Sequence, residues 1–171
     1  MGRRARAASR KLGQMTPADR TRGLQAVAAA IRASASKVLA ANAQDMDAAE
    51  AKGLDAAMLD RLALDAARLE GIASSVEAVA GLPDPIGKEL ARWERPNGLD
   101  IARIAVPLGV IGIIFESRPN VTIEAASLCL KSGNACILRG GSEAASSNRA
   151  LSEIISEALV LSGLPATAVQ V

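Results

Sequence analysis

The first half of the chain has apolar residues at intervals of three and four, the spacing that puts side chains on one face of a helix. The first such run consists of Leu24, Val27, Ile31, Val38 and Leu39. Residues 16–19 precede it and supply a Thr N-cap, a proline at the first helical position and an aspartate in the first turn. The pattern predicts a helix from near Pro17 to near Asn42.

Shorter helices are expected next. A second piece covers about residues 45–52 and ends at Gly53, because glycine readily adopts the left-handed conformation that ends helices. Asp55 is placed to cap a short third helix, and Asp65 precedes a fourth that ends near Gly81. The apolar positions of the fourth helix are Leu69, Ile72, Val76 and Val79. These helices are expected to form one lobe.

The pattern changes after residue 95. Asn97-Gly98 is a turn signal, and residues 99–106 are rich in branched aliphatics, which is typical of a strand. Shorter apolar runs then alternate with two further expected helices. The resulting order of strand, helix, strand, helix and strand covers residues 110–115, 120–131, 135–138, 143–161 and 168–171. Short connections between such elements are typical of a parallel α/β sheet.

The predicted fold class is therefore α/β, with an N-terminal helical lobe at residues 1–95 and the start of a Rossmann-like parallel sheet at residues 96–171. The sheet is incomplete, since only three parallel strands are predicted and no helix follows the last. Parallel strands need neighbours and a helical layer on both faces, and three strands with bare edges make a poor domain. We expect the chain to be the N-terminal part of a longer polypeptide, or to complete its sheet with another chain.

Composition argues against several classes of function. The chain has no histidine, so it lacks the base of Ser-His-Asp and Cys-His couples and the commonest neutral metal ligand, and we expect no metal site. A net charge of +2 with one Trp and one Phe argues against a nucleic-acid partner, because such proteins carry basic surfaces and stacking aromatics. No apolar stretch reaches the roughly 18 residues that span a bilayer, so no membrane association is expected.

Cysteine usage favours a reducing, cytoplasmic compartment. Cys129 and Cys136 form no disulfide framework and no paired Cys-x-x-Cys metal motif. Both lie among apolar residues of predicted elements, where a thiol has a raised pKa and is inert, so we interpret them as core residues. The basic N-terminus has the composition of a transit peptide, but a solvated face of a first helix is the favoured interpretation. Its cations are Arg3, Arg4, Arg6, Arg10 and Lys11.

Two loops follow predicted strands where α/β proteins bind phosphates and nucleotides, since helix amino termini and their free N–H groups converge there. The first loop contains Glu116, Ser117, Arg118, Pro119 and Asn120. The second contains Arg139, Gly140, Gly141 and a cap-like Ser142. Either loop alone is explained equally well as a turn, but two in succession favour nucleotide binding. The G-x-G-x-x-G fingerprint is absent from the turns, which disfavours an ordinary Rossmann dehydrogenase.

Six segments are long and unusual enough to indicate a family. They are ANAQD (residues 41–45), MLDRLAL (58–64), VPLGVIG (106–112), ESRPNVT (116–122), ASLCLKSGN (126–134) and ILRGG (137–141). Together they resemble the γ-glutamyl phosphate reductase family, the glutamate-5-semialdehyde dehydrogenases within the aldehyde dehydrogenase superfamily. The resemblance covers nearly the whole chain, which looks like the N-terminal portion of that family.

This resemblance implies NADPH-dependent reduction of L-glutamate 5-phosphate to L-glutamate 5-semialdehyde with release of phosphate, the second step of proline biosynthesis from glutamate. In the family a cysteine thiolate attacks the acyl phosphate, an oxyanion hole stabilises the tetrahedral intermediate, and hydride reduces the thioester. Residues 96–171 would then begin a variant, NADP-binding Rossmann-like domain. The resemblance also implies a cytoplasmic homo-oligomer with glutamate 5-kinase as a partner. Residues 99–106 would pair either between subunits or back onto their own domain.

The resemblance assigns roles to the first loop. Glu116, Ser117 and Arg118 match a stretch that passes between nicotinamide and acyl group in the superfamily, where it also supplies the side-chain amide of the oxyanion hole. Asn120 is the only amide in this loop and is the expected catalytic group. Counting from Pro107 instead places Arg118 at that position, so both alternatives stay open.

The resemblance assigns a cofactor role to the second loop. Arg139 matches a position where many relatives have a lysine beside the adenosine ribose, and Ser142 falls where NAD-preferring relatives often have a glutamate. A small neutral residue beside an arginine leaves room and charge for a 2′-phosphate, which agrees with NADPH. Gly140 and Gly141 complete this expected cofactor-binding set.

The catalytic nucleophile is not among these residues. The family's catalytic cysteine lies in a second domain beyond the matched segments, and neither Cys129 nor Cys136 matches its motif. We therefore expect no reductase activity from this chain alone. Two other interpretations remain: a non-catalytic module that binds NADP or a partner, and another member of the same superfamily.

Overall fold

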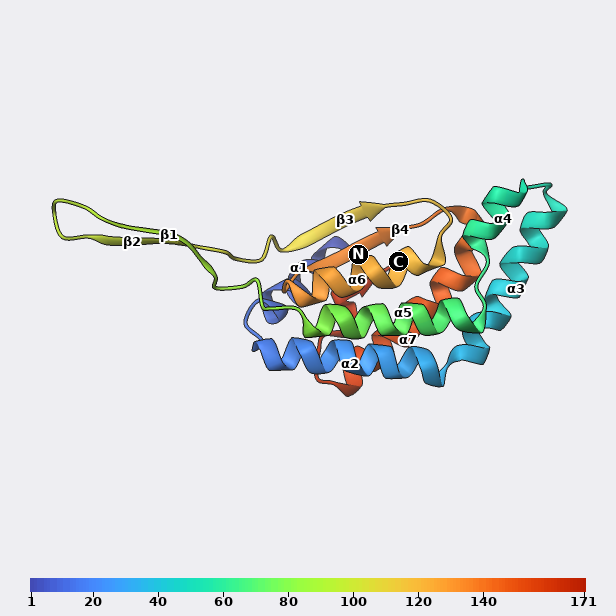
Figure 1. Cartoon of the computed structure of the whole chain (residues 1–171), viewed down its shortest axis with the longest axis horizontal. Coiled ribbons are helices and arrows are strands. Elements are labelled where there is room, and N and C mark those ends of the chain that lie inside the picture. The colour runs from blue at the N-terminus through green and yellow to red at the C-terminus, as the bar shows by residue number, and fades with distance from the viewer.

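The computed structural model describes residues 1–171 and contains a helical body, a short sheet and a projecting hairpin (Figure 1). The helices are α1 (Gly2–Leu12), α2 (Pro17–Ala33), α3 (Ala35–Ala51), α4 (Ala56–Leu62), α5 (Ala66–Gly81), α6 (Pro119–Lys131) and α7 (Ala145–Leu161). The strands are β1 (Glu89–Glu94), β2 (Asp100–Ile104), β3 (Val110–Ile114), β4 (Ala135–Arg139) and β5 (Val169–Gln170). Short 3-10 turns at residues 142–144 and 166–168 precede α7 and β5.

The three strands β3, β4 and β5 form one parallel sheet in that order. α6 connects β3 to β4 and α7 connects β4 to β5, so right-handed crossovers place both helices on one face. α1 packs against β3 and β4 from behind the sheet as drawn in Figure 1. The predicted α/β fold, with helices followed by a short parallel sheet, is confirmed.

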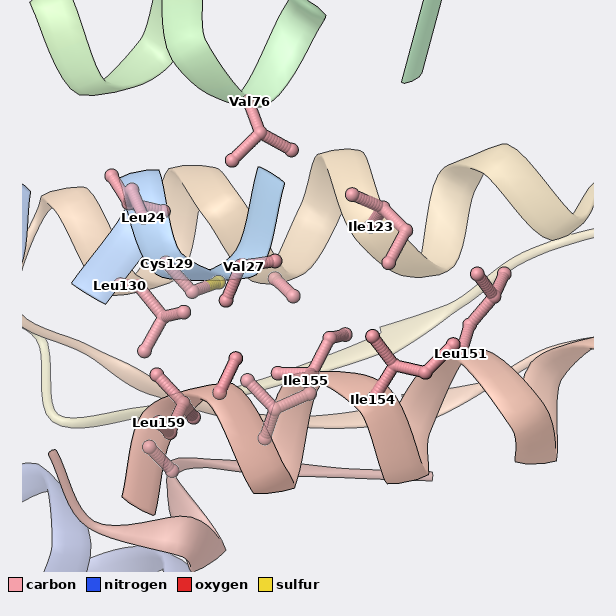
Figure 2. Packing of buried hydrophobic residues seen from close by; sticks show 14 of the residues in the cluster. Leu24, Val27, Val76, Ile123, Cys129, Leu130, Leu151, Ile154, Ile155 and Leu159 are labelled. Atoms are coloured by element: carbon pink, nitrogen blue, oxygen red, sulfur yellow. The ribbon is translucent and has the colours of Figure 1, made fainter. Parts of the chain in front are cut away.

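The two predicted halves of the chain share a hydrophobic core. Leu24 and Val27 from α2 and Val76 from α5 face Ile123 of α6 and Ile154 of α7 (Figure 2). Strand β4 closes the core from the other side with Ala135, Cys136 and Leu138. The helices therefore support the sheet directly, and the division between residues 95 and 96 stays a prediction.

Local capping signals placed the starts of α2, α4 and α5 correctly. The Thr16 hydroxyl accepts from the Asp19 backbone N–H at 3.2 Å while the Asp19 carboxylate accepts from the Thr16 N–H at 3.1 Å, a reciprocal capping box. Asp55 caps α4 and Asp65 caps α5 through one hydrogen bond each: their carboxylates accept from the backbone N–H groups of Met58 and Arg68 at 2.8 and 2.6 Å. The N-terminal cations are exposed on α1 while Ala5, Ala8 and Leu12 are buried, which confirms the solvated-face interpretation.

The predicted end of the long first helix near Asn42 was wrong. The chain breaks at Ser34, between α2 and α3, and Asn42 lies inside α3. The buried Asn42 amide donates to the Leu62 carbonyl at 2.9 Å and to the Ser147 hydroxyl at 3.0 Å, and accepts from the Leu64 N–H at 2.7 Å. Asparagine is a poor helix former, but these tertiary hydrogen bonds outweigh its local preference.

A two-stranded antiparallel hairpin extends away from the body (Figure 1). β2 confirms the predicted strand character of residues 99–106, and it pairs with β1 of the same chain, which the sequence pattern missed. Most side chains of the hairpin are exposed, so neither β1 nor β2 shows the apolar alternation that is typical of a half-buried strand. Gly98 has a φ of +83° in the turn, a conformation that favours glycine. No helix of the protein is both long and apolar enough to cross a membrane.

Two helical glycines predict opposite effects of alanine. A Cβ at Gly23 in α2 would lie 2.6 Å from the buried Leu164 side chain, so Gly23→Ala should cost about 1–3 kcal/mol of unfolding free energy through overpacking. A Cβ at Gly71 in α5 would meet no atom within 4 Å, so Gly71→Ala should add about 0.5–1 kcal/mol. Urea unfolding followed by circular dichroism measures both. Equal stabilisation by the two variants would show that Leu164 is free to move aside.

Candidate functional site

The two loops that the sequence singled out lie against each other at the carboxyl edge of the sheet. β3 and β4 are parallel neighbours with Ile114 opposite Arg139, and the Phe115 N–H extends the ladder to the Arg139 carbonyl at 3.0 Å. Beyond this pair the Ser117 hydroxyl donates to the Glu143 carboxylate. The structure therefore joins the first loop to the start of the connection into α7.

Gly140 and Gly141 permit this close approach of the loops. A Cβ at Gly141 would lie 2.8 Å from the Glu143 carboxylate and would also collide with the Ser117 hydroxyl. A Cβ at Gly140 would lie 3.1 Å from the Phe115 ring and would crowd the Asn148 amide. Protein atoms thus explain both glycines, and their contact with a cofactor stays a prediction.

The amino end of α7 is capped from a distant helix. The Asp45 carboxylate, on α3, accepts from the Ser146 N–H at 3.0 Å and from the Ser147 N–H at 2.7 Å, and Asp45 is buried. The Ser142 hydroxyl instead donates to Glu143 at 3.0 Å, so the expected cap role of Ser142 was wrong. Two of the first N–H groups of α7 are occupied by a protein carboxylate, and a phosphate cannot use them.

Glu143 is held as an anion by its neighbours. The Ser117 hydrogen bond is the main cause that lowers the pKa of Glu143 below its ordinary value, followed by bonds from its own backbone and from Ser142 and by the charge of Lys52. Because the carboxylate accepts Ser117 on one side and Ser142 on the other, it orders both predicted loops.

Asn120 and Arg118 meet in one cavity at the start of α6. The cavity has a volume of about 360 Å³, and Arg61, Arg68 and Glu124 also line it. The Asn120 amide donates to the Glu124 carboxylate, one helical turn along, at 3.1 Å, while the exposed side chain of Arg118 has no hydrogen-bond partner. Both side chains can donate to a developing oxyanion, so the geometry keeps both alternatives for that role.

A second cavity, of about 380 Å³, lies on the other side of Arg61 and Arg118, which line both. Its walls include Leu54, Met58 and the first-loop residues Glu116 and Ser117. Arg61, on α4, is 3.6 Å from the Glu116 carboxylate. Arg61 was not predicted as a site residue, because no local sequence pattern places α4 beside the first loop.

A third cavity, of about 360 Å³, surrounds the second loop. It brings together Arg139, Gly140, Gly141 and Ser142, as predicted, and adds Arg149 from α7. Arg149 was not predicted as a site residue, although its position in the helix directly after the second loop was a usable signal. Two guanidinium groups thus line one cavity beside a small neutral side chain and the carboxylate of Glu153, which is paired with Lys37 at 2.9 Å.

The cysteines lie in the core. Cys129 is 4% exposed and Cys136 is fully buried. The hydrogen bond with Cys129 and burial together raise the pKa of Cys136 far above its ordinary value, so this thiol is inert. No group of three or more carboxylate or thiol side chains in the structure could hold a metal ion.

A sequence model described as the aldehyde dehydrogenase family matches residues 1–171. The chain belongs to the aldehyde dehydrogenase family. It is 70% identical over 170 residues to a γ-glutamyl phosphate reductase from Hyphomonas neptunium. The matched region covers 99% of this chain and 40% of the relative. The predicted resemblance is confirmed, and the chain spans about 40% of the length of the curated relatives it matches.

Solved structures give the same result. The γ-glutamyl phosphate reductase from Thermotoga maritima has a TM-score of 0.96 and 40% identity, covering 98% of this chain and 41% of that one. The enzyme of that name from Saccharomyces cerevisiae has a TM-score of 0.93 and 32% identity, covering 98% of this chain and 44% of the other. Aldehyde dehydrogenases use a nicotinamide cofactor, and the loops of β3 and β4 lie at the edge where α/β folds bind nucleotides.

The hydrogen bond from Ser117 to Glu143 makes a testable prediction about the pKa of Glu143. Ser117→Ala removes the main cause of the lowered pKa, so the pKa of Glu143 should rise towards its ordinary value, by more than in the matched variant Ser142→Ala. NMR titration of the side-chain carboxyl carbon measures this shift. An unchanged titration in Ser117→Ala would contradict the contact.

The sign of the effect on stability follows from the same shift. Because the pKa of Glu143 is lower folded than unfolded, the ionised carboxylate stabilises the fold above its unfolded pKa of about 4.3. That contribution is lost as the pH falls through the folded pKa, and Ser117→Ala should reduce it.

Proposed function

We propose that this chain belongs to an enzyme that reduces L-glutamate 5-phosphate to L-glutamate 5-semialdehyde with NADPH and releases phosphate, in proline biosynthesis. The observation that carries the proposal is the 70% identity over 170 residues to a γ-glutamyl phosphate reductase. The cationic cavity at the start of α6 supports it, because the substrate is an anion and its reaction develops negative charge on oxygen.

The residues of this chain would bind and orient the acyl group. As a thiolate attacks the acyl phosphate, the carbonyl oxygen becomes negative, and the Asn120 amide and Arg118 guanidinium are the donors nearest the amino end of α6. Glu124 orients the Asn120 amide through their 3.1 Å hydrogen bond. NADPH, when bound, supplies hydride to the acyl carbon. The nucleophile is not Cys129 or Cys136, since both are buried in the core.

The cofactor part of the proposal is NADPH rather than NADH. Arg139 and Arg149 line one cavity with Ser142, which is too short to repel or block a 2′-phosphate. Guanidinium groups bind phosphate oxygens through paired hydrogen bonds, so two of them beside a small neutral residue fit the extra phosphate of NADPH.

We extend the proposal to a cytoplasmic homo-oligomer with glutamate 5-kinase, which makes the acyl phosphate, as a partner. Two free cysteines in the core suit a reducing compartment. The projecting hairpin exposes Trp93, Leu99 and Ile104, apolar side chains that a second subunit would cover.

The proposed activity is measurable in the reverse direction. In the full-length protein, Cys129→Ala and Cys136→Ala should keep kcat for phosphate-dependent oxidation of glutamate 5-semialdehyde within about threefold of wild type, because neither thiol reacts. Residues 1–171 alone should show no turnover. Turnover by residues 1–171, or complete loss in a correctly folded cysteine variant, would overturn this assignment.

Cofactor choice is testable separately. Arg139→Gln and Arg149→Gln in the full-length protein should each lower the kcat/KM ratio of NADPH to NADH about tenfold, since each removes one phosphate contact worth about 1.4 kcal/mol. Arg22→Gln, on the exposed face of α2, is the matched control and should leave the ratio unchanged. Equal losses with both cofactors would show that these guanidiniums do not contact the 2′-phosphate.

A further inference from the structure

The cavity at the start of α6 contains more charged groups than stabilisation of one oxyanion requires. Three helices contribute to it: Asp60 and Arg61 from α4, Arg68 from α5, and Glu124 from α6. Arg118 lies at its entrance as the residue before α6. The protein itself already pairs some of these charges.

Arg68 and Asp60 form an ion pair with each other. The Arg68 guanidinium donates to the Asp60 carboxylate at 2.6 Å and to the backbone carbonyls of Asp60 and Ala63 at 2.5 and 2.9 Å. These bonds tie the end of α4 to the start of α5. Both charges therefore have a structural role in the wall of the cavity and are not available to a ligand.

Two cations and one carboxylate remain without full partners. The Arg118 side chain makes no hydrogen bond or ion pair, and Arg61 has a single long ion pair, with Glu116 at 3.6 Å. Glu124 accepts the Asn120 amide on one oxygen only, which leaves its other oxygen free. These three side chains fit a ligand that carries two anionic groups and one ammonium group.

We propose that this cavity recognises the α-amino acid end of the substrate, with Arg61 binding the α-carboxylate and Glu124 binding the α-ammonium. Arg118 and Asn120 then face the activated acyl group at the other end. This inference rests on the proposed function and adds the residues that select a zwitterionic γ-acyl phosphate over a simple aldehyde.

The arrangement on α6 agrees with this placement. Asn120 and Glu124 are four residues apart on one face, and the Asn120 amide donates to one Glu124 oxygen at 3.1 Å. The reacting carbon and the α-nitrogen of the substrate are separated by four single bonds, which extend over about 5 Å at most. A substrate that lies across this hydrogen-bonded pair presents its carbonyl to Asn120 while its ammonium reaches the other Glu124 oxygen.

The same charges reject other aldehydes. An apolar aldehyde in this cavity would remove water from Arg61 and Glu124 without replacing their hydrogen bonds, and that desolvation is unfavourable. Gly71 adds room on the opposite wall, because a Cβ there would meet only open space. The cavity thus combines space for a short chain with charges at defined positions.

The test compares two aldehydes in the full-length protein, by phosphate-dependent oxidation of L-glutamate 5-semialdehyde and of 5-oxopentanoate, which lacks only the amino group. Glu124→Gln keeps an oxygen for Asn120 but loses the negative charge. It should lower kcat/KM for the aminated aldehyde at least tenfold and leave that for 5-oxopentanoate within about twofold. Arg61→Gln should raise KM for both aldehydes at least tenfold, with partial recovery in Arg61→Lys, and Arg22→Gln should change neither.

The outcomes separate the inference from the function on which it rests. Equal losses on both aldehydes in Glu124→Gln would show that this carboxylate acts only through Asn120, and an unchanged KM in Arg61→Gln would remove Arg61 from carboxylate binding. If the wild-type enzyme is active, either result overturns the inference and leaves the proposed function intact. A full-length wild type that oxidises neither aldehyde would instead overturn the proposed function and the inference with it.

Discussion

The two buried polar side chains of α3, Asn42 and Asp45, position most of the groups that surround the candidate site. Asp45 holds the first turn of α7 through two backbone N–H groups, and Asn42 holds both the α7 residue Ser147 and the connection between α4 and α5. A buried group left without its partner costs about 1–3 kcal/mol, so this arrangement strongly disfavours alternatives. The second loop and the wall that carries Arg61 are therefore anchored to one helix.

A second buried contact completes this framework. The Thr122 hydroxyl of α6 donates to the Asn148 amide oxygen of α7 at 2.8 Å, and both side chains are buried. Since α6 carries Asn120 and Glu124 while α7 follows the second loop, this bond fixes the position of α6 relative to that loop. The charged groups proposed to bind ligands lie at the rim, whereas uncharged or fully paired polar groups hold the elements from inside. That division avoids the cost of burying an unpaired charge.

Much of the fold followed from local patterns. Thr16, Asp55 and Asp65 cap helices because an Asx or Thr oxygen reaches an N–H three residues ahead, an interaction that needs no tertiary partner. The hairpin strand β1 was missed because its side chains are mostly exposed and so lack an apolar alternation. Asn42 was wrongly predicted to end a helix, because its hydrogen-bond partners lie 20 to 105 residues away in the sequence. The loops were recognised, but Arg61 and Arg149 were not, since both come from helices outside those loops.

The sequence by itself determined the starts of α2, α4 and α5, the alternation of strands and helices in a parallel sheet, the burial of both cysteines and the identity of the two loops, because these depend on spacing, capping and local apolar runs. Only the tertiary structure decided which charges face each loop. Arg61 reaches the first loop from α4, Asp45 rather than Ser142 caps α7, and Arg68 is already paired with Asp60. The physical reason is that helix packing brings these partners together. Asp45 and Ser147, for example, are 102 residues apart, and the local sequence around either residue carries no information about the other.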